Sequence, residues 1–319
     1  MSRFPVIIGP TAGGKSALAV EVCHALNASG RGPAEVVTAD SMQVYRGMDI
    51  GTAKPTMTER QGIPHHLLDI VEPTDSFSVD QWLKLAEATI ADVRARGGIP
   101  VVVGGTNLYV KALLEGLFDG PAADAALRAE LAAMDPHARR AELERVDPAA
   151  AERIHFNDDR RTIRALEVHR LTGTPISSHQ KQWEQAGVRE DALVIGLEWP
   201  TPAINLRINA RVKQMVAAGL VEEVQGLLAA GRLGVQAREA LGYKQLVGAI
   251  ETGTAGAIDD AVEQIKIETR RLAKNQRTWL KRFRGIRGAS GMPASVWVEM
   301  TERDAAEVAQ VLVSQRFNT

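Results

Sequence analysis

Residues 6–20 read "VIIGPTAGGKSALAV", an apolar run followed by a glycine-rich turn and then by a helical pattern. The turn fits the pattern G-x-x-x-x-G-K-[ST] at every fixed position from Gly9 to Ser16. Because an apolar strand precedes the turn and a helix follows it, backbone amides and the helix N-terminus converge where a phosphate would lie. A strand-to-helix turn without a ligand is the alternative, but such a turn needs neither the lysine nor the serine.

The stretch therefore predicts a phosphate-binding loop. Lys15 would bring its charge to the terminal phosphate oxygens, and the Ser16 hydroxyl would help to hold a magnesium ion, Mg2+. The residues expected to bind phosphate are Gly9, Pro10, Thr11, Ala12, Gly13, Gly14, Lys15 and Ser16. The same kind of loop serves nucleotide hydrolysis, kinase chemistry and reactions in which a diphosphate departs, so the loop alone leaves the reaction open.

The first 117 residues alternate short apolar runs with helical patterns, which predicts a parallel sheet with helices on both faces. We expect strands at "FPVIIG" (4–9), "EVVTAD" (35–40), "HHLLDIV" (65–71) and "IPVVVGG" (99–105). One helix should run from Lys15 to about Ser29. A second, long helix should begin at the capping box Ser78–Gln81 and end at Gly97.

Residues 118–190 carry helical patterns only. Asp135 and Asp147 each precede a proline, as an N-cap precedes proline at the first helical position, and Gly173 ends a further helix. Strand character returns at "ALVIGLEW" (192–199) and again at "SVWVEM" (295–300). We expect a P-loop NTPase-like α/β core in two parts, residues 1–117 and 191–319, with an all-helical insertion domain at 118–190 between them.

The composition is that of an ordinary globular protein: of 319 residues, 45% are hydrophobic and 24% charged, and the net charge is -1. That balance does not mark the whole chain as a nucleic-acid binder, so any basic patch must be local. The single cysteine, Cys23, excludes an internal disulfide and a zinc site of several thiolates. No apolar stretch approaches the roughly 18 residues that span a bilayer. We expect a cytoplasmic monomer with no membrane partner.

The phosphate loop lacks the usual hydrolytic partners. ATPases and GTPases carry a strand that ends in a metal-binding acid, together with a group that aims water. Here the strand "IPVVVGGTN" ends in glycines and Thr106, and the acid is Asp40, at the end of another strand. Strand ends meet at the ligand crevice, so both residues should face the loop, with Asp40 a candidate base for a nucleophile other than water. A purely structural capping role is the alternative for each.

The segment "KIETRRLAKNQRTWLKRFRGIR" (266–287) carries nine basic residues and one acidic residue. At helical spacing, one face should be cationic, while Leu272, Trp279, Leu280 and Phe283 anchor the other side. The expected cationic face is Arg270, Lys274, Arg277 and Lys281. It predicts contact with a phosphate backbone, against the alternative of a solvated face.

Two further groups of arginines stand out. Arg207 and Arg211 lie one helical turn apart, a spacing at which they could clamp a diphosphate, although solvent-facing arginines at this spacing are common. In the helical insertion, Arg160, Arg161 and Arg164 add local charge, but acidic neighbours balance it.

The chain resembles the tRNA dimethylallyltransferases, also called tRNA isopentenyl transferases, through motifs in the family order. These are "GPTAGGKS", "ADSMQVYRGMDIGTAKPT", "PHHLLDI", "VVVGGTNLYVKALLEGL", "RRTIRALEVHRLTGTP", "RINARVKQMVAAGLVEEV", "ALGYKQ" and "TRRLAKNQRTWLKRF". The resemblance implies transfer of a dimethylallyl group from dimethylallyl diphosphate, with Mg2+, to the exocyclic amine of the adenosine 3′ of the anticodon. The implied partners are dimethylallyl diphosphate and the anticodon stem-loop of tRNA.

The resemblance also implies residue roles. The phosphate loop, with Lys15, Arg207 and Arg211, would hold the donor diphosphate; Asp40 would accept a proton or hydrogen bond from the adenine amine, and Thr106 would complete that contact. Implied tRNA contacts are Asp40, Ser41, Met42, Gln43, Thr106, Arg128, Arg160, Arg161, Thr162, Ile163 and Arg164. Three positions depart from the family pattern: Gly13 for serine, Asn107 for glycine and Arg160 for glutamine.

Three rival functions fit parts of the pattern. One is a related transferase that prenylates free adenine nucleotides, and another is a small-molecule kinase in which Asp40 deprotonates a hydroxyl. The third is an RNA-binding module that uses nucleotide only as a switch. The basic segment and the helical insertion favour a tRNA substrate.

Overall fold

The computed structural model describes residues 3–117, 120–179, 188–287 and 294–317. The chain forms two compact units, one made of Met1–Leu114 with Arg189–Thr319 and the other of Glu115–Val188. The expected insertion domain, residues 118–190, begins at residues that lie outside the described ones, and its bounds stay a prediction. No helix of the described residues is both long enough and apolar enough to cross a membrane.

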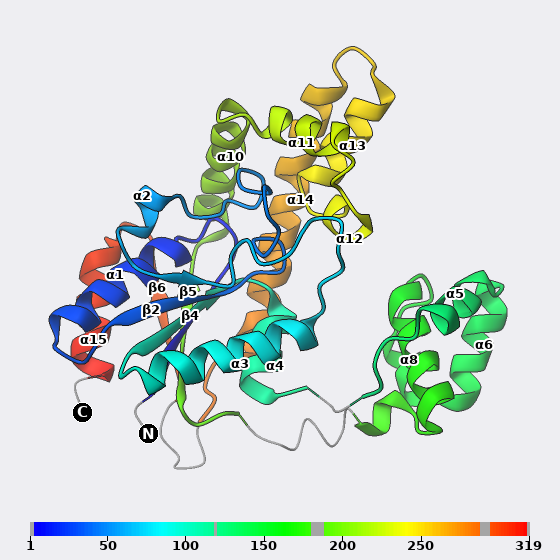
Figure 1. Cartoon of the computed structure of the whole chain (residues 1–319), viewed down its shortest axis with the longest axis horizontal. Coiled ribbons are helices and arrows are strands. Elements are labelled where there is room, and N and C mark those ends of the chain that lie inside the picture. The colour runs from blue at the N-terminus through cyan, green and yellow to red at the C-terminus, as the bar shows by residue number, and fades with distance from the viewer. Residues whose placement is uncertain (1–2, 118–119, 180–187, 288–293, 318–319) are drawn as a thin grey trace. The chain divides into compact units, whose positions relative to one another are not determined.

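The apolar runs of the first unit form a six-stranded parallel sheet in the order β3-β2-β4-β1-β5-β6 (Figure 1). The strands are β1 (Phe4–Ile8), β2 (Ala34–Ala39), β3 (His65–His66), β4 (Ile99–Gly104), β5 (Ala192–Glu198) and β6 (Ser295–Glu299). The predicted run of strand from 65 to 71 is wrong beyond its first two residues. Leu67 and Asp69 have φ of 63° and 54°, which turn the chain out of the sheet.

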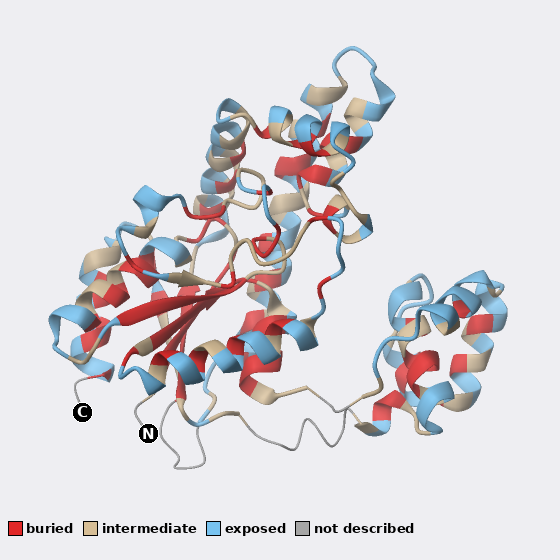
Figure 2. Ribbon diagram, in the orientation of Figure 1, coloured by how far each residue is buried: buried red, intermediate tan, exposed pale blue. Residues whose placement is uncertain are grey.

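Helices cover both faces of the sheet, as predicted (Figure 2). One face packs against α1 (Lys15–Ala28) and α15 (Ala305–Arg316), in a buried cluster that includes Ile7 and Leu312. Because successive strand residues point to opposite faces, the neighbours of Ile7 face the other layer.

That layer contains α3 (Val79–Ala95) and α4 (Asn107–Glu115). Trp82 of α3 is fully buried, and its indole Nε1 donates to the Thr38 carbonyl at 2.9 Å. The same ring stacks on Tyr109 of α4, with 4.5 Å between the ring centroids. The capping box predicted at the start of α3 is confirmed.

The remaining helices of the first unit include two long ones, α10 and α14, which pack on each other. Helix α13 packs on both α14 and α11. Their bounds, with those of the short helices, are α2 (Met57–Arg60), α10 (Thr201–Ala217), α11 (Leu220–Ala229), α12 (Val235–Arg238), α13 (Tyr243–Thr252), α14 (Ala257–Leu280) and the 3-10 turn η1 (Lys281–Phe283).

The second unit is helical in its described residues (green in Figure 1). Asp135 and Asp147 accept hydrogen bonds from the first amides of their helices, and Gly173, at φ 71°, ends the helix that begins at Asp159, so these capping predictions are confirmed. Leu131, Leu143 and Leu166 form its own buried core. Its helices include α5 (Ala125–Ala133), α6 (Pro136–Val146), α7 (Pro148–Arg153) and α8 (Asp159–Thr172).

Candidate active site

The loop Gly9–Ser16 lies between β1 and α1 and reverses the chain. Ala12 and Gly14 take positive φ of 59° and 83°. The Lys15 ammonium folds back and donates to the Pro10 carbonyl at 2.8 Å. Helix α1 starts without a side-chain cap and without an acidic residue in its first turn. Its first amides have no carbonyl partner within the helix, so they are suited to an anion.

Two side chains hold the back of this loop, one directly after β5 and one on α10. The Trp199 indole Nε1 donates to the Gly13 carbonyl at 3.0 Å, and Arg207 Nε donates to the Ala12 carbonyl at 2.9 Å. The Arg207 guanidinium lies 4.6 Å from the Trp199 ring centroid. Arg207 therefore lies beside the phosphate loop, attached to it through its own hydrogen bond.

A third support, Gln276 of α14, was missed by sequence reasoning. It is 6% exposed. Its Oε1 accepts from the Thr11 amide at 2.8 Å, and its Nε2 donates to the Gly105 carbonyl at 2.8 Å. The side chain thus ties the phosphate loop to the end of β4. The sequence feature that could have pointed to Gln276 is its neutral amide, in a helix whose other polar residues are mostly charged.

The glycines that follow the apolar core of β4 permit this close approach. A Cβ at Gly104 would collide with the Ala39 carbonyl of β2. A Cβ at Gly105 would lie 2.8 Å from Gln276 Nε2 and 3.3 Å from Lys15 Nζ. Gly104 therefore requires glycine for the strand end to reach its neighbour, and a side chain at Gly105 would displace the Gln276 amide.

Asp40 and Thr106 follow adjacent strands, β2 and β4, and the structure brings both against Ser41. Asp40 Oδ1 accepts from the amides of Met42 at 2.9 Å and Gln43 at 3.3 Å, which fixes the turn after β2. Thr106 Oγ1 accepts from the Ser41 amide at 3.0 Å and donates to Ser41 Oγ at 3.3 Å. Within the described part of the chain, no hydrogen bond is made to the other oxygen of Asp40.

The charges around the loop are predominantly positive. Burial, and after it the charge of Arg211, lower the pKa of Lys15 to about 8, while Asp40 acts in the opposite direction. Burial also lowers the pKa of Arg211, again opposed by Asp40. The charge of these two partly desolvated cations is opposed by Asp40 and, at Arg211, also by Glu59. An anion bound between the cations would stabilise their charged forms further.

Asp40, Thr11 and Arg211 line one pocket, whose volume is about 130 Å³. Its remaining lining is mainly apolar: Met42, Gly51, Thr52, Ile208, Val212, Met215, Leu220, Ala240, Leu241, Gly242, Ile265, Thr269 and Leu272. The volume is similar to that of an apolar cavity of roughly 150 Å³ that admits benzene. The pocket therefore combines a polar end with room for a small apolar group.

The expected cationic face of α14 is divided by the structure. Lys274 and Lys281 are exposed. Arg270 instead donates to Asn209 Oδ1 at 2.6 Å, and Arg277 donates to Thr201 Oγ1 at 2.8 Å. These two arginines are thus engaged with α10.

On the apolar side of α14, the structure contradicts one of the predicted anchors. Leu280 and Phe283 are each 1% exposed, as expected of anchors. The prediction for Leu272 is wrong, because this residue is 39% exposed and lines the pocket.

In the helical unit, Glu167 organises two of the implied tRNA contacts. Its buried carboxylate accepts from Arg128 at 2.8 and 2.9 Å and from Arg164 at 2.5 Å. Burial by itself would raise the pKa of Glu167, but the ion pairs with the two arginines outweigh that effect and lower the pKa. Thr162 is 3% exposed and is therefore not a surface residue.

The neighbouring implied contacts differ in exposure. Arg160 and Arg161 are exposed, and Arg161 pairs with Asp158 at 3.0 Å. Ile163 packs against the core of the helical unit.

These features define a class: an α/β phosphate-loop protein in which a cationic anion site opens onto a small apolar pocket and a carboxylate. A family model described as IPP transferase matches residues 43–283. The chain belongs to this family.

Related proteins of known family support this membership. The chain is 45% identical over 290 residues to a tRNA dimethylallyltransferase of Rhodopirellula baltica, covering 89% of this chain and 86% of that one. It is 42% identical to a tRNA dimethylallyltransferase of Geobacillus thermodenitrificans, covering 97% and 95%. The family inferred from the motifs, and with it the prediction of a tRNA-prenylating transferase, are confirmed.

Solved structures give the same result. A tRNA delta(2)-isopentenylpyrophosphate transferase of Staphylococcus epidermidis superposes with a TM-score of 0.68 at 34% identity, covering 99% of this chain and 98% of that one. A eukaryotic dimethylallyltransferase, described as acting on tRNA, superposes at 0.78 with 26% identity, covering 99% and 78%.

Proposed function

We propose that this chain transfers a dimethylallyl group from dimethylallyl diphosphate to the exocyclic amine of the adenosine 3′ of the anticodon in tRNA, releasing diphosphate. One observation carries the proposal: Asp40, Arg211 and Thr11 line the same small apolar pocket, at the phosphate loop. Anion site, acceptor base and apolar group would then meet at one place. We place the reaction in the cytoplasm and expect a monomer.

Asp40 is the proposed catalytic base. In the transfer, the adenine nitrogen forms a bond to the allylic carbon while the bond from that carbon to the diphosphate oxygen breaks. The amine must lose a proton, and the oxygen of Asp40 that is not used by the turn can accept it. Thr106 would hold the acceptor beside it through the turn at Ser41.

The departing diphosphate develops negative charge, and its stabilisation is the task of the phosphate loop. Lys15, Arg211 and Arg207 are the proposed cationic contacts, with the first amides of α1. Ser16, exposed in the first turn of α1, fits Mg2+, which typically takes few protein oxygens and completes its shell with water and phosphate. When bound, Mg2+ would neutralise part of the charge on the leaving group.

The apolar lining suits the five-carbon group of the donor. Ile208, Val212 and Ile265 are each buried, and they surround the space next to Arg211. An allylic centre with carbocation character reacts readily with water, so an apolar wall protects it until the amine attacks.

The acceptor must be taken out of the anticodon-loop stack, at a cost of a few kcal/mol that pocket contacts offset. Ser41, Met42 and Gln43 are the proposed contacts at the base. Lys274 of α14 and Lys281 of η1 are exposed and suit a phosphate backbone. In the helical unit, the proposed contacts to the anticodon stem-loop are Arg128, Arg160, Arg161, Ile163 and Arg164.

The test is incubation of the purified chain with Mg2+, labelled dimethylallyl diphosphate and unmodified tRNA, followed by nuclease digestion and mass analysis of the nucleosides. We expect a prenylated adenosine next to the anticodon. Parallel reactions with AMP and ATP in place of tRNA serve as controls. Label on free nucleotides alone would overturn the tRNA substrate, and no transfer to any acceptor would overturn prenyl transfer.

A further inference from the structure

The segment Asp49–Lys54 forms one wall of the pocket. Gly51 and Thr52 line the cavity together with Asp40. Gln43 joins this wall to the turn after β2, because its Nε2 donates to the carbonyls of Thr52 and of the next residue, at 3.1 Å each. The position of the wall and the position of the proposed base are therefore connected through a few hydrogen bonds.

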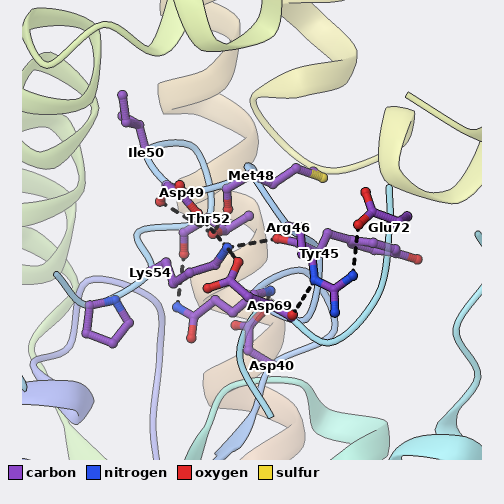
Figure 3. Close-up of polar contacts among 12 residues, drawn as sticks. Asp40, Tyr45, Arg46, Met48, Asp49, Ile50, Thr52, Lys54, Asp69 and Glu72 are labelled. Atoms are coloured by element: carbon purple, nitrogen blue, oxygen red, sulfur yellow. Dashed lines mark hydrogen bonds and ion pairs between the residues drawn. The ribbon is translucent and has the colours of Figure 1, made fainter. Parts of the chain in front are cut away.

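Lys54 holds this segment from one side (Figure 3). Its side chain is 4% exposed, and its ammonium donates to the Tyr45 carbonyl at 2.8 Å. The same group donates to carboxylate oxygens of Asp49 and Asp69, at 2.5 Å each. All three ammonium protons are thus used, and none is directed at the pocket.

Glu223, on α11, holds the segment from the other side. Its Oε2 accepts from the amides of Asp49 at 2.9 Å and Ile50 at 2.8 Å, and its Oε1 accepts from the Gly51 amide at 3.2 Å. The Tyr243 hydroxyl donates to the same Oε1 at 2.5 Å. Burial, and after it the Glu223 charge, raise the pKa of Tyr243, so the phenol remains a donor.

The wall itself packs tightly on these helices. A Cβ at Gly51 would lie 2.5 Å from the Tyr243 ring and 2.9 Å from Leu220 Cδ1. Even one methyl group at this position would push the segment away from the helices. The wall is thus fixed by backbone hydrogen bonds and by direct contact.

We infer that Lys54 and Glu223 are positioning residues, whose joint hold on Asp49–Lys54 sets where Gly51 and Thr52 place the allyl group relative to Asp40. Neither side chain is a lining residue of the pocket. The phosphate loop is held separately, by Gln276, Trp199 and Arg207. The inference rests on the proposed function, and it predicts that transfer and diphosphate binding can be separated.

The first test uses Glu223→Gln and Lys54→Met, with Glu222→Gln and Lys84→Met as matched controls. Glu222 is the exposed neighbour on α11, and Lys84 is an exposed lysine paired with Asp80. We expect kcat/KM for dimethylallyl diphosphate to fall about ten- to a hundredfold in both test variants, the size typical of a misplaced reactant. The Kd for inorganic diphosphate, measured by calorimetry, should stay within about twofold.

Two further variants show whether the effect runs through the segment. In the double variant Lys54→Met/Glu223→Gln, kcat/KM should be close to that of the less active single variant, because both changes release the same segment. Gly51→Ala keeps both charges and should still raise KM for dimethylallyl diphosphate, with the Kd for inorganic diphosphate unchanged. If Lys54→Met does not fold, Glu223→Gln and Gly51→Ala carry the test.

Three results would overturn the inference alone: wild-type kcat/KM in the test variants, a loss of diphosphate affinity as large as the loss of transfer, or losses that multiply in the double variant. Absence of any transfer by the wild-type protein would overturn the proposed function, and the inference with it.

Discussion

At the scale of single residues, the two oxygens of Asp40 have separate tasks. Oδ1 is committed to the turn, through the amides of Met42 and Gln43. In the proposed mechanism, the other oxygen accepts the proton of the acceptor amine. One carboxylate therefore builds the local structure and supplies the proposed base, which makes the two roles separable by a conservative substitution.

Asp40→Asn should preserve the turn, because an amide oxygen can still accept from both backbone amides, while the base is lost. We expect kcat for tRNA prenylation to fall by about a hundredfold or more, the usual size of base assistance. The midpoint of thermal unfolding and the Kd for inorganic diphosphate serve as controls and should hardly change. Wild-type turnover in this variant would rule out Asp40 as the base.

We expect Lys15 to make diphosphate binding depend on pH. The pKa of this lysine is lowered to about 8, and a bound anion should raise it again. Binding then takes up a proton above pH 8, so the affinity for inorganic diphosphate should fall as pH rises, by about tenfold per unit at most.

The comparison for this prediction is Lys15→Arg, since arginine remains charged throughout the range. The ratio of the two Kd values, measured from pH 7 to 10, removes the titration of the diphosphate itself. A ratio independent of pH would show that Lys15 does not lose its proton in this range.

At the scale of elements, α14 has three roles at once. Gln276 supports the phosphate loop, Leu272 lines the pocket, and Lys274 is exposed to solvent. Leu272 and Gln276 are four residues apart and share one side of the helix, while Lys274 lies on the opposite side, so one element can position the donor site and present charge to RNA.

Lys274→Glu should weaken tRNA binding and make it less dependent on salt, because one phosphate contact and its released counterion are lost. We expect the slope of log K against log salt to become shallower by about one unit. Lys84→Glu on α3 is the control for a reversed charge elsewhere on the surface. An unchanged slope in Lys274→Glu would show that this face of α14 does not dock RNA.

At the scale of the whole molecule, the pocket and the phosphate loop belong to the unit that contains the sheet. The helical unit has its own buried core and its own buried carboxylate, Glu167. Small donor ligands should therefore act on one unit and leave the other unchanged.

Hydrogen exchange with and without saturating inorganic diphosphate tests this separation. A ligand present at about a hundred times its Kd stabilises the state that binds it by about 2.7 kcal/mol, so protection should rise at β1, α1 and the start of α4. Exchange within α5 to α8 should not change. Protection of these helices by diphosphate alone would show that the two units are coupled before tRNA binds.

The sequence by itself determined the fold class, the phosphate loop, most strands and the helix caps, because each depends on local periodicity or on a few adjacent residues. It also placed Asp40 and Thr106 at neighbouring strand ends, since parallel strands bring their ends to one edge.

Only the tertiary structure decided how the pocket is assembled. Gln276 bonds to the amide of Thr11, 265 positions away, and no local pattern encodes that pairing. Leu272 looked like a core residue because periodicity reports which face of a helix is apolar, but not whether that face meets protein or a cavity. The hold of Glu223 on the wall at Gly51 is equally non-local, because it exists only once α11 packs beside that segment.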